Sequence, residues 1–114
     1  MSKIQIERYT LVKTETMNNN PIIKVLGTFN SVNEAKKEAE KRIEETLTNI
    51  IKGQNNLKAK EEVDHILSML KTTKDKIEYI ESHDVIVIEN QENDIMTLIF
   101  NKEQIKYHIG IDKK

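Results

Sequence analysis

The sequence predicts an α+β fold with the element order β-β-α-α-β-β. In this fold a four-stranded, mostly antiparallel sheet carries two amphipathic helices on one face. Segments rich in Ile, Val, Thr and Tyr near both ends of the chain indicate strands. Between them, apolar residues recur at helical spacing, which indicates helices that bury one side. The first helical segment also begins with Ser31-Val32-Asn33-Glu34, the pattern of an N-terminal capping box.

The chain of 114 residues, 1–114, is expected to form one small domain. Hydrophobic residues make up 37% and charged residues 32%, and the apolar residues cluster in periodic segments, so we expect a folded chain. Aromatic residues make up only 4% and Trp is absent. The core is therefore expected to consist mainly of Ile, Leu and Val.

The N-terminal part is expected to form an antiparallel hairpin. Its apolar residues change face between Ile6 and Tyr9, which predicts a bulge or a twist near Arg8. Gly27 predicts a break or a bend in the second strand. A polar stretch that includes Pro21 separates the two strands and is typical of a loop. The expected strands of this hairpin are residues 3–15 and 22–29.

Two helices are expected next. In the capping box, Ser31 accepts from the N–H of Glu34 while the Glu34 carboxylate reaches back to the N–H of Ser31. The first helix is expected to end near Lys52 and Gly53. Its inward stripe is Ala35, Ala39, Ile43, Leu47, Ile50 and Ile51. The second helix covers 57–71 and, after so short a break, is expected to lie beside the first; its inward residues are Ala59, Val63, Ile66, Leu67 and Leu70.

The C-terminal part contains the most informative feature, the two apolar runs Val85-Ile86-Val87-Ile88 and Ile95-Met96-Thr97-Leu98-Ile99-Phe100. The expected strands are 77–89 and 95–101, with 77–82 ambiguous between strand and helix. The runs barely alternate, so both faces of the hairpin need cover. Two helices cover one face of the sheet. The second face is then left to the tail at 102–111, a helical turn or a short edge strand, or to a partner.

Several classes of function lack support in the composition. The net charge is −1, which does not favour DNA, RNA or an anionic membrane, and no stretch reaches the ~20 apolar residues of a membrane span. There is no Cys, so disulfides and thiolate zinc sites are excluded. The three glycines are far apart and form no phosphate-binding loop. We expect a cytoplasmic protein without a cofactor or a small-molecule substrate.

Catalytic and metal-binding patterns are weak. Ser82-His83-Asp84 has the residue types of a hydrolase triad, but neighbours on a strand point to opposite faces and cannot form one. Glu61 and His65 share a helix face, but two ligands are too few for structural zinc. We therefore predict neither an enzyme nor a metal site. An enzyme would need a pocket that gathers several of these groups: Glu61, His65, His83, Asp84 and His108.

A regulatory nucleic-acid-binding protein is the alternative prediction. The best nucleic-acid candidates are basic residues of the first expected helix, Lys36, Lys37, Lys41 and Arg42. Glutamates alternate with them, so little uncompensated positive charge remains for phosphate groups.

The leading prediction is a non-catalytic protein–protein interaction module. It would be a homodimer or a small adaptor or inhibitor protein of bacterial or phage type. No Lys or Arg lies between Lys76 and Lys102, so the apolar hairpin is bordered by acidic residues. These either keep the hairpin soluble or form the rim of a contact with a basic partner. The predicted partner-binding residues are Glu78, Glu81, Asp84, Val85, Val87, Glu89, Glu92, Asp94, Met96, Leu98 and Phe100.

Overall fold

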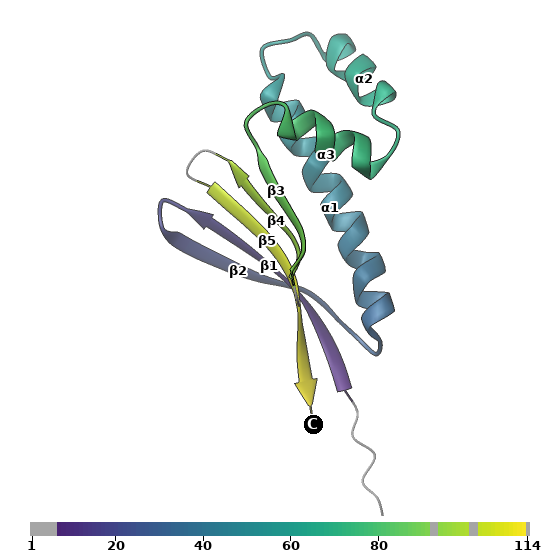
Figure 1. Ribbon diagram of the computed structural model, residues 1–114, viewed down its shortest axis with the longest axis vertical. Helices are drawn as coiled ribbons and strands as arrows, with labels where there is room; N and C mark the ends of the chain where they lie inside the picture. The colour runs from purple at the N-terminus through teal and green to yellow at the C-terminus, as the bar shows by residue number, and fades with distance from the viewer. Residues whose placement is uncertain (1–6, 92–93, 101–102, 114) are drawn as a thin grey trace, which may run out of the picture.

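The computed structural model describes residues 7–91, 94–100 and 103–113, which form a five-stranded antiparallel sheet and three helices (Figure 1). The class is α+β, but the expected order with four strands and two helices is wrong. The strand order is β2-β1-β5-β4-β3, so β2 and β3 are the edges. The elements are β1 (Glu7–Met17), β2 (Asn20–Phe29), α1 (Val32–Gln54), α2 (Lys60–Met69), α3 (Thr73–Glu81), β3 (Ile86–Gln91), β4 (Asp94–Phe100) and β5 (Glu103–Lys113).

The fifth strand, β5, replaces the expected tail. It pairs with β1 along its whole length and with β4 on its other side, so it is the central strand of the sheet. Ile105, Tyr107 and Ile109 alternate with polar residues, and Tyr107 and Ile109 are buried. This alternation is the period of a strand with one buried face. The sequence predicted only a helical turn or a short edge strand here, because the two strands that pair with β5 lie in different parts of the chain.

The third helix, α3, includes most of the segment that was ambiguous between strand and helix. Its N-terminus has a complete capping box: the Asp75 N–H donates to Thr72 Oγ1 at 3.0 Å, and the Thr72 N–H donates to the Asp75 carboxylate at 3.2 Å. Ile77 and Ile80 share one helix face and are buried. The expected strand at 77–89 is therefore wrong in its first part, and β3 begins only at Ile86.

The start of α1 agrees with the sequence on one of two hydrogen bonds. The Glu34 N–H donates to Ser31 Oγ at 3.2 Å, as predicted. The Glu34 carboxylate instead accepts from the Asn30 N–H, at 3.3 Å, so the reciprocal half of the predicted capping box is wrong. The carboxylate still satisfies a backbone donor beside the helix start.

The end of α1 lies beyond the predicted glycine stop. Gly53 is helical, without a positive φ, and the helix continues to Gln54. Asn55 then caps it, because the Asn55 N–H donates to Ile51 O at 3.2 Å and its side-chain amide donates to the same oxygen at 2.8 Å. The Asn55 amide also donates to Tyr79 Oη at 3.0 Å, which ties α1 to α3. The helix is therefore capped by Asn55 and does not end at the predicted Gly53.

The core lies between α1, α3 and one face of the sheet. Figure 1 shows the three helices gathered on the same side of the strands. The helix that packs most closely on α1 is α3, which contributes Ile77 and Ile80 to the core. The expected close packing of the first two helices is therefore not the main contact between helices. The predicted stripe of α1 is buried except for Ile50, which is half-buried. The core consists of Leu11, Ala35, Ala39, Ile43, Leu47, Ile51, Ile77, Ile80, Val85, Met96, Leu98, Tyr107 and Ile109.

The β1–β2 hairpin has a tight turn and one bulge. Asn18 and Asn19 have φ values of 52° and 67°, which is the conformation of a two-residue type I′ turn. Leu11 pairs with Gly27 and Val12 pairs with Val25, so Leu26 is the extra residue of a bulge. The irregularity thus lies at Leu26, beside Gly27, where the sequence predicted a break or bend, and β2 continues through both residues. Of the two alternatives predicted near Arg8, the bulge is wrong, because that residue pairs regularly with β5, and the twist stays a prediction. Residues 3–6 of the expected strand lie outside the described residues.

Candidate functional site

One face of the sheet carries exposed aliphatic side chains near both edges. Ile23 and Val25 of β2 are 67% and 65% exposed, and Ile86 and Ile88 of β3 are 60% and 38% exposed. The strand registers place these four residues opposite to the face that packs on α1. We call them the open face. Among the described residues, no helix covers it, and the expected tail cannot, because it is β5 within the sheet.

Polar residues separate the two ends of the open face. The Lys106 ammonium of β5 lies 3.6 Å from the Asp94 carboxylate of β4. His108 of β5 has a buried Nδ1 that makes no hydrogen bond within the described part of the chain. Thr97 is buried on this side although no helix lies over it. The surface therefore presents two aliphatic edges and a polar centre.

The apolar residues predicted to bind a partner lie on the other face. Val85, Met96 and Leu98 are buried in the core, and Val87 and Phe100 are half-buried against it. Alternation in a strand sends neighbouring side chains to opposite faces. The exposed apolar residues of this hairpin are therefore the neighbours Ile86 and Ile88.

The predicted acidic residues do not gather in one place. Glu78 and Glu81 are exposed on α3, Asp84 is exposed in the turn before β3, and Glu89 is exposed on β3. Asp94 is half-buried, and the Lys106 ammonium compensates its charge. Lys106 lies on β5, whose place beside β4 the sequence did not predict. Glu92 lies outside the described residues.

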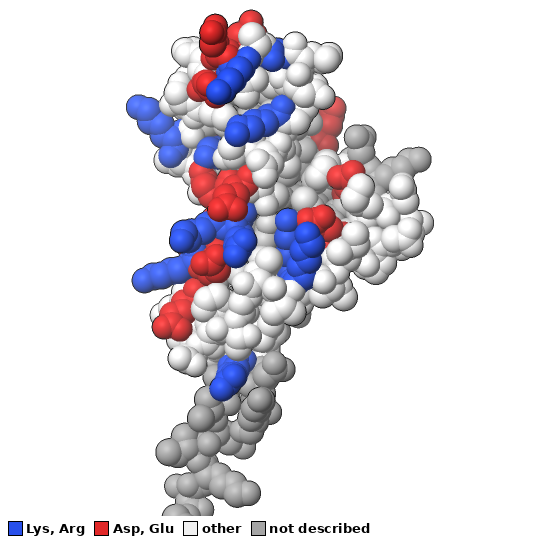
Figure 2. All heavy atoms as spheres, turned by 180° about the vertical axis from the view of Figure 1, so that it is seen from behind, with Lys and Arg blue, Asp and Glu red and all other residues white. Residues whose placement is uncertain are grey.

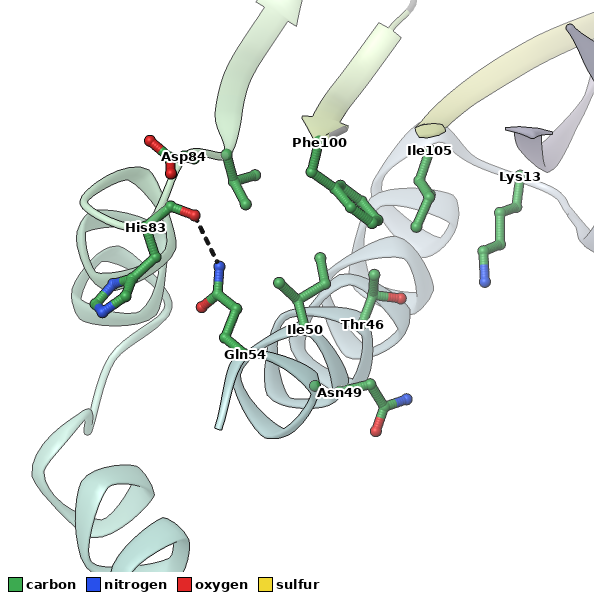
Figure 3. A pocket seen from close by; sticks show the side chains of 11 residues that line it. Lys13, Thr46, Asn49, Ile50, Gln54, His83, Asp84, Phe100 and Ile105 are labelled. Carbon is green, nitrogen blue, oxygen red and sulfur yellow. Dashed lines mark hydrogen bonds between the residues drawn. The ribbon is translucent and has the colours of Figure 1, made fainter. Parts of the chain in front are cut away.

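A pocket of about 500 Å³ lies between the C-terminal half of α1 and the sheet (Figure 3). Its apolar lining comes from Ile50 of α1, Val85 before β3, Phe100 of β4 and Ile105 of β5. Ligand pockets in proteins usually measure about 300–1,000 Å³ and are lined mainly by apolar groups. The pocket thus has a volume typical of a small-molecule site. It could not be predicted from the sequence, because its walls come from five separate segments.

Lys13 lies at one end of the pocket, and its surroundings favour the charged form. Its ammonium is 2.7 Å from the Glu15 carboxylate and 5.9 Å from the centre of the Tyr107 ring. Burial alone would lower the pKa of Lys13, but Glu15 and Tyr107 together raise it above its ordinary value. The hydrogen bond from Lys13 lowers the pKa of Glu15. Lys13 therefore remains a cation at neutral pH.

His83 and Asp84, from the predicted Ser82-His83-Asp84 pattern, lie at the other end of the pocket. The Ser82 hydroxyl donates to Tyr79 O at 2.6 Å, and His83 Nδ1 lies 2.8 Å from the same oxygen. The His83 ring stacks on the Tyr79 ring with centroids 4.4 Å apart. In Figure 3 the His83 ring and the Asp84 carboxylate both point away from the space between α1 and the strands. These contacts satisfy the Tyr79 carbonyl group in the last turn of α3.

The remaining groups named for an enzyme lie elsewhere. Glu61 and His65 line a shallow depression on α2, and His108 lies on β5 on the side opposite to α1. Within the described part of the chain, no three His, Asp or Glu side chains are close enough to hold a metal ion together. The structure therefore distributes these groups over three places.

The basic residues of α1 stand among acidic ones. Arg42 Nε donates to the Glu38 carboxylate at 2.9 Å, one helical turn away. Figure 2 shows basic and acidic side chains interspersed over the surface in view. No observation on this surface favours nucleic-acid binding, which stays a prediction.

Comparisons with protein-family models, with curated proteins and with solved structures found no match. The helices in the described ranges are all too short or too polar to cross a membrane.

Proposed function

We propose that this protein is a non-catalytic protein–protein interaction module that binds its partner through the open face and the edge strand β2. The observation that carries the proposal is the exposure of Ile23 and Val25, which stand side by side on this face. Ile22, on the opposite side of the same strand, is also 50% exposed. Three large aliphatic residues in four positions of one edge strand are left without cover from the described residues.

Such an edge is unfavourable for a protein that acts alone. An edge strand has unpaired N–H and C=O groups that can pair with another strand, and exposed apolar side chains strengthen that contact. Pro21 and Lys24 are the residues of β2 that oppose unselective pairing, by removing a donor and by adding charge. Binding would remove the aliphatic side chains from water, at about 25 cal/mol per Å² of apolar area.

The partner is either a second copy of the chain or a different protein, in which case this chain acts as a small adaptor or inhibitor of bacterial or phage type in the cytoplasm. Glu78 and Glu81 of α3 and Glu89 of β3 lie on the helix side of the sheet and do not border the open face. Their effect on a basic partner would therefore be limited to attraction during encounter. The alternative, a regulatory nucleic-acid-binding protein, predicts a steep salt dependence in a gel-shift titration.

The proposal is tested by size exclusion with light scattering, together with capture of partners from the source cell. The variant is Ile23→Lys with Val25→Lys, and the matched control is Thr28→Lys, an exposed position on the same face of β2. We expect the double variant to lose dimerisation or capture and the control to keep it. Equal assembly by all three proteins would refute the proposed surface.

A further inference from the structure

The pocket between α1 and the sheet lies on the side opposite to the open face and needs its own explanation. Gly53 lines it in the last turn of α1, and a Cβ built at this position would have no atom within 4 Å. Its φ is not positive, so the backbone does not require glycine. Glycine is less favourable than alanine within a helix. The residue therefore weakens the helix while leaving the pocket wider.

The chemistry of the lining changes along the pocket. Ile50, Phe100 and Ile105 face the space together with Val85, as Figure 3 shows for the three that it labels. The carboxylate of Asp84 is turned away, whereas Lys13 extends from β1 at the opposite end. The cavity therefore offers an apolar wall on the strand side and at Ile50, with Thr46, Asn49 and Gln54 of α1 beside it and a cation at one end.

Lys13 keeps donor capacity for a ligand. An ammonium has three N–H donors, and Glu15 and the Tyr107 hydroxyl take two of them, so one remains for a ligand. The ammonium would attract a carboxylate on a ligand, and the nearby Glu15 carboxylate would repel it and so weaken its binding. Substitutions at Lys13 and at Glu15 should therefore change the affinity for such a ligand in opposite directions.

We propose that this pocket binds a small amphipathic acid. Its carboxylate contacts the Lys13 ammonium, and its aliphatic chain lies along Ile50, Phe100 and Ile105. The acid has the chemistry of a medium-chain fatty acid, because the apolar wall matches the chain and charge-assisted hydrogen bonds match the head group.

The test is a titration of the full chain with octanoate, octan-1-ol and octylammonium, followed by calorimetry and by amide NMR shifts. We expect octanoate to bind best and to shift amides around Gly53 and Phe100. Lys13→Met should weaken octanoate binding at least about tenfold. Glu15→Gln should tighten it by about threefold. Neither change should affect octan-1-ol.

Two further variants separate the site from general effects. Lys106→Met removes a cation from the other face of the sheet, and octanoate binding should remain within about twofold of the wild type. Gly53→Phe fills the open space without replacing a packed residue, so the fold should persist while binding of octanoate and octan-1-ol is lost. Equal affinity for the three probes, or octanoate binding that survives both Lys13→Met and Gly53→Phe, would overturn the proposal, as would no binding by the folded wild type.

Discussion

The hydrogen bond between Thr46 and Tyr107 joins α1 to the central strand β5, and its removal should have a measurable cost. The hydroxyl oxygens lie 2.5 Å apart, with Tyr107 1% exposed and Thr46 9% exposed. Removing one partner of a buried hydrogen bond leaves the other without its partner, which costs about 1–3 kcal/mol. Tyr107→Phe and Thr46→Val should each lower the free energy of unfolding by an amount in this range.

The double variant gives the sharper result. With both hydroxyls absent, neither is left unsatisfied, so the loss should be smaller than the sum of the two single losses by about 1 kcal/mol. Urea unfolding of the four proteins measures this coupling. Single losses that add to within about 0.3 kcal/mol would refute the claim that these residues stabilise each other. Such a result would also mean that this hydrogen bond does not help to hold α1 against β5.

Three other predictions follow from individual side chains. Gly53→Ala should raise the free energy of unfolding by about 0.5–1 kcal/mol, measured in urea, because the helix gains propensity and the new methyl group meets no atom; a loss of stability would mean that the position is not open. Burial raises the pKa of Glu44, but hydrogen bonds from Lys76 and Thr73 lower it overall below the ordinary 4.5. The stabilisation from Glu44 is therefore present above pH 4.5 and lost as the pH falls through the lowered pKa, so Glu44→Gln should reduce the acid-induced decrease in urea midpoint; an unchanged acid limb would contradict this. Glu89→Lys should slow association with a basic partner most strongly at low salt, as stopped-flow mixing would show, and an unchanged rate would exclude steering.

The first half of the chain was predicted well because its signals are local. Ser31 begins α1 as its sequence pattern indicates, and the helical stripe from Ala35 to Ile51 is buried nearly as expected. The second half depends on contacts between distant segments. Ile105 and Tyr107 form a central strand only because β1 and β4 pair with it on either side, and no pattern within 102–111 specifies those partners.

The candidate sites show the same difference. The sequence indicated that one face of the sheet would lack cover, but it did not specify which residues of the apolar hairpin would face outward. In the structure Leu98 is buried and Ile86 is exposed, because β3 begins later than expected and pairs with β4 in a register that local alternation did not reveal. The sequence did not give the strand order, so it could not show that β2 is an edge strand with Ile23 exposed.

The central claim, that the open face contacts another protein, is tested most directly by photo-crosslinking in the source cell. A photoreactive residue is placed at Ile23, at Ile86 or, as a control, at Lys36 on the exposed side of α1. The account predicts specific adducts from positions 23 and 86, to a second copy or to another protein, and none from position 36. Adducts from position 36 alone, or none from position 23, would contradict it.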